Sequence, residues 1–187
     1  MKKELRNHLL PIGIIFLVTT IFWIFSQIPY YQYLFLFFGL ILGTFFLDLD
    51  HLIYWFYIKP NTEESREAQS LIKSKKILDT LKFFGHTHKT HTNLVFHHFF
   101  FQVVLGLISF LVYTSSQNIF ILSFLLALNI HLLTDEIEDF IYHPKHLQGW
   151  LFAREEKQLP IEQVRYYLIL FIVFSLFFTF LLIRSQL

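Results

Sequence analysis

The chain has 187 residues, a length typical of one domain, but its 55% apolar and 16% charged residues are not the composition of an ordinary soluble domain. It has no cysteine, which excludes disulfides, thiolate metal ligands and cysteine nucleophiles. The net charge of +1 by itself favours no class of partner. From the apolar composition we expect the partner to be a lipid bilayer, and we expect no nucleic acid.

Three long runs contain no Asp, Glu, Lys or Arg: 9–47, 90–134 and 166–183. Because about 20 apolar residues cross a bilayer, each of the first two runs is long enough for two crossings. Polar breaks, SQIPYYQ and YTSSQN, divide these runs near their middles. The sequence therefore predicts an all-α, polytopic transmembrane helical bundle, a single domain over 1–187, with five spans near 9–27, 31–50, 92–113, 118–135 and 165–184.

Basic residues are distributed unevenly around the predicted spans. Lys2, Lys3 and Arg6 precede the first span as in a signal peptide, but no small-residue cleavage site follows, so we expect an uncleaved span. With five spans, every Lys and Arg except Arg184 lies on the side of the N-terminus. Since basic residues concentrate in cytoplasmic loops, we expect the N-terminus in the cytoplasm and the C-terminus outside.

Two non-chemical features lie in and after the second span. Gly39 and Gly43, four residues apart, would allow close approach of a neighbouring helix, or are ordinary glycines of a membrane helix. The cytoplasmic segment 60–85 has a helix-start pattern, and its Ile77, Leu81 and Phe84 recur at helical spacing among lysines. This favours an interfacial amphipathic helix over a solvated loop.

Ionisable side chains gather at the ends of three predicted spans. They are Asp48, Asp50 and His51 after the second span, His86 and His91 before the third, and His131 and Asp135 in the fourth. Such residues are costly in a membrane and mark function by default. The predicted topology brings all seven to the cytoplasmic face, which favours one shared site over separate helix caps or solvated groups.

The spacing and chemistry of these residues indicate a metal site. His131 and Asp135, at i and i+4, share a helix face, as do Asp48 and His51 at i and i+3, whereas Asp50 points elsewhere. Oxygen and imidazole donors suit catalytic zinc, and also manganese or iron. Seven candidates exceed the three protein ligands of one catalytic zinc, so we expect two ions, or one ion with supporting residues.

The remaining histidines have less specific contexts. His88 is either a ligand or a solvated neighbour, and His97 lies deeper in the predicted third span. His98 would share a helix face with His91, as a proton relay or supporting residue. We expect His8 to be a polar contact between helices, and His143, His146 and the acidic residues after Asp135 to be solvated.

The three motifs resemble a known family. They are similar, in the same order, to three motifs of the membrane-bound metal-dependent hydrolases, prokaryotic inner-membrane proteins of which some are LexA-regulated. The motif D-x-D-H corresponds to Asp48-Leu-Asp50-His51, and H-x-x-x-D corresponds to His131-x-x-x-Asp135. The motif G-H-R-G-x-T-H corresponds to Gly85-His86 with Thr90-His91. The resemblance covers roughly residues 30–145. Thr87-His88 replaces the family's Arg-Gly pair, so its planar anion clamp is not reproduced.

The resemblance implies a metal-dependent hydrolase in the plasma (inner) membrane of a prokaryote, with a cytoplasmic metal site. The seven residues would bind a divalent metal, with Asp50 as ligand, bridge or catalytic base, and metal-activated water would attack an ester or phosphoester. A lipid substrate is expected because the site would lie at headgroup depth. The alternative is a non-catalytic membrane metal-binding protein, a carrier or sensor; the substrate and oligomeric state stay open.

Overall fold

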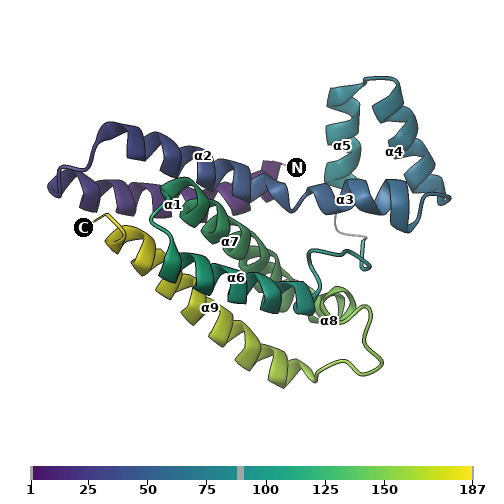
Figure 1. Ribbon diagram of the computed structural model, residues 1–187. Coiled ribbons are helices and arrows are strands. Elements are labelled where there is room, and N and C mark those ends of the chain that lie inside the picture. Colours follow the sequence, from purple (N-terminus) through teal and green to yellow (C-terminus); the bar gives the residue numbers. More distant parts are fainter. Residues whose placement is uncertain (1, 88–90, 187) are drawn as a thin grey trace.

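The computed structural model describes residues 2–87 and 91–186, which form helices joined by short turns (Figure 1). No strand occurs in these residues, so the predicted all-α fold is confirmed. The helices are α1 (Lys2–Phe25), α2 (Tyr30–Phe46), α3 (Leu49–Ile53), the π-helical turn η1 (Tyr54–Ile58), α4 (Glu63–Lys73), α5 (Ile77–Thr87), α6 (Phe99–Ser115), α7 (Ile119–Tyr142), α8 (Pro144–Leu151) and α9 (Ile161–Arg184).

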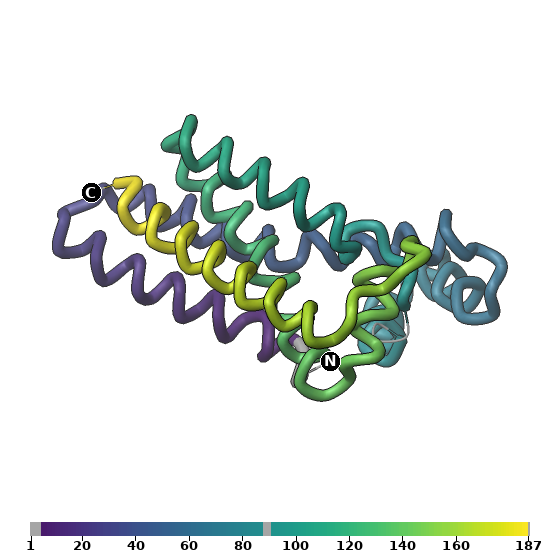
Figure 2. The backbone as a smooth tube through the Cα atoms, turned by 90° about the horizontal axis from the view of Figure 1, so that it is seen from below, coloured from purple at the N-terminus to yellow at the C-terminus, as the bar shows by residue number. Residues whose placement is uncertain are grey.

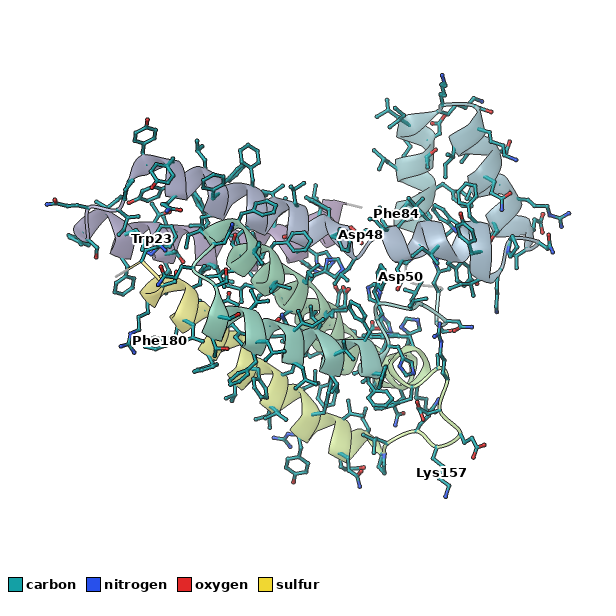
Figure 3. All side chains as sticks on the ribbon, in the orientation of Figure 1. Trp23, Asp48, Asp50, Phe84, Lys157 and Phe180 are labelled. Carbon is teal, nitrogen blue, oxygen red and sulfur yellow. The ribbon has the colours of Figure 1, made fainter. Side chains whose placement is uncertain are left out.

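In the part of the chain that the structure describes, four helical segments are long and apolar enough to cross a membrane: Leu5–Phe25, Tyr30–Ile58, Ile119–Tyr142 and Ile161–Arg184. The second of these combines α2, α3 and η1. Large apolar side chains on their outer surfaces are exposed, for example Phe180, which points away from the bundle (Figure 3). An apolar exterior of this kind fits a membrane protein, as the composition predicts.

The predicted third span differs from the structure at its start. Its helix, α6, begins at Phe99 instead of 92 and has 17 residues, because residues 91–98 are not helical. The carboxylate of Asp50 accepts the N–H groups of Val95 and Phe96 at 3.0 and 2.5 Å, and His98 caps α6 by accepting the Phe100 N–H. Side chains thus satisfy backbone groups that a helix would otherwise pair.

Helix α7 lies at the centre of the bundle and packs against α1, α2, α6, α8 and α9. Its side chains are buried on several faces, including Leu122, Leu126 and Leu132. The antiparallel α1–α2 pair flanks it on one side, and α6 and α9 flank it on the other (Figures 1 and 2). Residues 119–128 of α7 are apolar on all sides except at Ser123, as expected of a helix segment that other helices surround.

The contact between α2 and α7 depends on the two glycines of α2. A Cβ atom at Gly39 would lie 2.0 Å from the Ser123 Oγ, and one at Gly43 would lie 2.4 Å from the Phe124 carbonyl oxygen. Only glycine permits this approach, so the predicted role of the pair in close helix packing is confirmed. The glycines thereby fix the position of α2 against residues 120–127 of α7.

The two ends of the bundle differ in structure. The N-terminus, α3, η1, α4, α5 and α8 lie at one end, whereas the C-terminus and the short α1–α2 and α6–α7 turns lie at the other (Figures 1 and 2). Helices α4 and α5 form a hairpin that projects across the direction of the long helices (Figure 1). Thr62 caps α4 by accepting the Ser65 N–H, close to the predicted helix start.

Candidate metal centre

Three side chains from α1 and α7 meet near the α3 end of the bundle. The two carboxylate oxygens of Asp135 lie 3.3 Å from the Nε2 atoms of His8 and His131, one oxygen to each ring. The two imidazoles are stacked, with centroids 4.3 Å apart. One donor atom from each residue lies within 4.8 Å of the others, so this trio, which we name the bundle cluster, could hold a metal ion.

The orientation of His131 is fixed by the backbone of α2. Its Nδ1 lies 2.6 Å from the Thr44 carbonyl oxygen, which can only accept, so Nδ1 carries the hydrogen. The Nε2 atom therefore faces Asp135. Both Nε2 and the adjacent Asp135 Oδ2 are buried without a hydrogen bond in the described structure. Two buried acceptors facing each other are costly unless a cation or proton lies between them.

The donor atoms of the bundle cluster are of the kinds that bind divalent metal ions. Two imidazole nitrogens and one carboxylate match the three protein ligands that zinc takes when a fourth position is left for water or substrate. The Nδ1–H of His131 donates to a carbonyl oxygen. Metal-binding histidines commonly make such a bond with the ring nitrogen that does not bind the metal, and it fixes the orientation of the ring. Asp48, at the start of α3, adds a carboxylate whose Oδ1 lies 3.9 Å from the His131 Nε2.

A second polar group joins α3 to the α4–α5 hairpin. The Nδ1 atoms of His51 and His91 are 2.6 Å apart, and the His91 Nε2 lies 2.5 Å from Glu64 Oε1. Glu64 also accepts from the Trp55 indole, and the His91 ring stacks on Tyr54. We name His51, His91 and Glu64 the hairpin cluster; its side chains form a continuous chain of short contacts.

His97 lies between the two clusters. Its Nδ1 is 3.3 Å from Asp50 Oδ2 and its Nε2 is 3.6 Å from Asp135 Oδ2. Burial alone would lower the pKa of His97, but the interactions with Asp135 and Asp50 outweigh burial and raise the pKa to about 9. The structure thus places the imidazole of His97 between two carboxylates.

A cleft of about 40 Å³ connects these groups, with room for only a few water molecules. Its lining comprises His51, His91, Leu94, His97, Asp135, Glu138, Asp139, His146 and Trp150. The Asp139 carboxylate accepts from the His146 Nδ1 at 2.6 Å and from the Trp150 indole at 2.8 Å. Asp135 is the residue that belongs to both the cleft and the bundle cluster.

The structure distributes the seven predicted site residues over several positions. His131 and Asp135 are in the bundle cluster with Asp48 beside them, and His51 and His91 are in the hairpin cluster. Asp50 is fully buried, and its oxygens bind the 91–98 segment and His97 (Figure 3).

His86 is exposed near the end of α5 and, among the described residues, belongs neither to the bundle cluster nor to the cleft lining. His88 lies outside the described residues.

Four residues at the site were missed or assigned a different role from sequence: His8, Glu64, His97 and His146. His8 was expected only to contact other helices, yet it supplies a donor atom to the bundle cluster. His146 was expected to be solvated, but α8 folds it against Asp139 in the cleft wall. His8 could have been found, because it directly precedes the predicted span 9–27 and therefore lies at the same predicted membrane face as Asp135.

Comparison with protein-family models, with curated proteins and with solved structures finds no match to this chain.

Proposed function

We propose that the protein is a membrane-embedded, metal-dependent hydrolase that acts on an ester or phosphoester at the cytoplasmic membrane face. One observation carries this proposal: Asp135 belongs both to the bundle cluster and to the lining of the polar cleft. An ion held by the bundle cluster would therefore be reached by a substrate group in the cleft. A purely structural set of polar contacts would not require such access.

The bundle cluster residues His8, His131 and Asp135 would hold the ion, with Asp48 able to join them. Zinc suits this set of nitrogen and oxygen donors best, and manganese or iron would also be accepted. When bound, the ion supplies Lewis acidity, which lowers the pKa of water and polarises a phosphoryl or carbonyl oxygen.

The residues around the cleft have separate roles in the proposed reaction. His97, held between Asp50 and Asp135, would stabilise negative charge on a substrate oxygen in the cleft through its own positive charge, in part replacing the arginine of the similar family motif. His51 and His91 line the cleft, and the contact of His91 with Glu64 gives a proton a route away from the reacting atoms. Asp50 acts as a positioning residue for His97.

The distribution of charge supports a cytoplasmic site. Every Lys and Arg in the described residues except Arg184 lies in or next to the elements at the α3 end of the bundle. The crosswise α4–α5 hairpin exposes Ile77 and Leu78 by 70% and 74%, which favours contact of α5 with the membrane surface. With α6 as a fifth span, the site lies at headgroup depth, where lipid esters are found.

The proposal is tested with purified protein in detergent. We expect about one bound zinc, manganese or iron per chain, and hydrolysis of phosphoester substrates that a chelator abolishes and metal restores. Asp135→Asn should lose both metal and turnover. Asp79→Asn, which alters an exposed carboxylate on α5, is the matched control and should retain both.

Two outcomes would contradict the proposal. Absence of bound metal in the wild-type protein would remove the basis for any metal-dependent activity. Bound metal that is lost in Asp135→Asn, with no turnover of any ester, would instead support the non-catalytic carrier or sensor.

A further inference from the structure

A groove lies between α6 and α9 on the outer side of the bundle, away from the cleft. Its volume is about 410 Å³, within the range of small-molecule sites. Its apolar lining comprises Val103, Gly106, Leu107 and Phe110 of α6 and Leu170, Phe171, Phe174 and Phe178 of α9. Leu107 and Leu170 are exposed by 62% and 55%. Because α9 is long enough to cross a membrane, lipid hydrocarbon surrounds the mouth of this groove.

One end of the groove is polar and is joined to the candidate site. Gln102 and Tyr167 line this end, and the Tyr167 hydroxyl donates to the Gln102 side-chain oxygen. The Gln102 amide donates in turn to the His97 carbonyl oxygen at 3.1 Å, and His97 lines the cleft. Since α6 and α9 both run from the site end to the far end (Figure 2), the groove extends from the level of the site into the membrane.

The length of the groove matches one leaflet. From Tyr167 to Phe178 along α9, a rise of 1.5 Å per residue gives about 16 Å, which is about half of a ~30 Å hydrocarbon core. A hydrocarbon chain whose ester or phosphate group lies at the depth of the site would occupy this distance. Asn129 of α7 also lines the groove, with its amide bonded to the Ser109 hydroxyl and the Leu125 carbonyl oxygen. Apart from this residue the groove is apolar, and its other polar groups lie at the end nearest the site. A lipid chain that carries a polar group at one end has a similar distribution of polarity.

Gly106 keeps the α6 wall open. A Cβ atom at this position would meet no heavy atom within 4 Å, in contrast to the closely packed Gly39 and Gly43 of α2. Gly106 therefore leaves space in the groove instead of permitting contact with another described helix. A large side chain at this position would fill that space without displacing the backbone.

We propose that the α6–α9 groove binds one hydrocarbon chain of a bilayer lipid and so presents the polar group of that lipid at the level of the cleft. The proposed binding of the hydrocarbon chain depends only on the groove. Cleavage of the presented ester or phosphoester rests on the proposed hydrolase function.

Chain binding is tested with phosphatidylglycerol carrying a diazirine in mid-chain, in phosphatidylglycerol and phosphatidylethanolamine vesicles that contain the full-length protein. Peptide mapping should show labelling concentrated on 103–110 and 170–174, well above the comparably exposed α1 face at Leu10, Ile14 and Leu17. Gly106→Phe should reduce groove labelling about tenfold, since displacing two buried methylene groups costs roughly a factor of ten in affinity. Gly13→Phe on α1, where an added Cβ also meets nothing within 4 Å, should leave it unchanged.

A kinetic measurement separates this proposal from the proposed function. Gly106→Phe should lower the ratio of long-chain to short-chain phosphoester turnover about tenfold, by the same loss of buried methylene groups, whereas Gly13→Phe should not change the ratio. If the groove is labelled but the protein hydrolyses no phosphoester, the chain-binding proposal stands and the proposed hydrolase function is wrong.

Equal labelling of the α1 and groove faces would overturn the chain site. So would a wild-type dimer that Gly106→Phe converts to a monomer by light scattering, because the groove would then be covered by a second copy of the chain.

Discussion

The bundle cluster and the hairpin cluster contain similar side chains but differ in how they are held. The bundle cluster draws its donors from α1 and α7, and the His131 Nε2 and Asp135 Oδ2 have no hydrogen bond within residues 2–87 and 91–186. In the hairpin cluster, His91 contacts both His51 and Glu64 through its two ring nitrogens. Two histidines and a carboxylate therefore do not define a metal site by composition. In the bundle cluster one donor atom of each residue faces a common point, whereas in the hairpin cluster His91 pairs with His51 through one ring nitrogen and with Glu64 through the other.

The largest expected effect tests the bundle cluster directly. His131→Ala removes the donor that the Thr44 carbonyl orients, so metal affinity should fall by more than about 100-fold, beyond the loss that follows removal of a supporting partner. Competition with a chromophoric chelator measures this affinity. His143→Ala, which alters an exposed histidine just after α7, should bind metal like the wild type. Equal affinity of the two variants would exclude His131 as a ligand.

A smaller effect, a loss of stability, is expected from a substitution at Asp50, which binds the segment between the two clusters. Asp50→Asn replaces two accepting oxygens by one and places an amide donor against a backbone N–H. The free energy of unfolding should fall by about 1.5–3 kcal/mol, because bonds to a charged group are lost. Denaturant titration in micelles measures it, with Asp79→Asn as the control. Unchanged stability would mean that Asp50 does not hold the 91–98 segment.

Helix packing should influence the bundle cluster through α2. Gly43→Leu forces α2 away from the Phe124 carbonyl, and overpacking of this kind costs about 1–3 kcal/mol of stability. Thr44 follows Gly43 directly, so the contact from its carbonyl to His131 should weaken and metal affinity should fall with stability. Gly13→Leu, at an open position of α1, should change neither quantity.

The smallest effect on metal binding is expected in the hairpin cluster. His91→Ala leaves all three bundle donors in place, so metal affinity should change by less than about 0.5 kcal/mol, as for sites without shared partners. Turnover should nevertheless fall, because the route from the cleft to Glu64 is broken. If this variant bound metal much more weakly than the wild type, the two clusters would have to be regarded as parts of one metal site.

The sequence was sufficient for the helical class and for the α2–α7 contact, because both depend on local features: apolar run length and glycine spacing. It was also sufficient to bring Asp48, His131 and Asp135 together, because a helix fixes i and i+4 neighbours and topology fixes the membrane face. The structure of residues 91–98 was not predictable in the same way. Its backbone is satisfied by Asp50, more than 40 residues earlier, and no local pattern reports such a contact.

The donors of the bundle cluster are far apart along the chain, which has a consequence for biogenesis. Helices of a membrane protein insert first and pack afterwards. His8 enters the membrane with α1 but cannot meet Asp135 until α7, the central helix, has been synthesised and docked. Metal binding at this cluster would therefore report that the first and central helices have assembled in their native order, and a ribosome-bound intermediate lacking α7 would have no such centre.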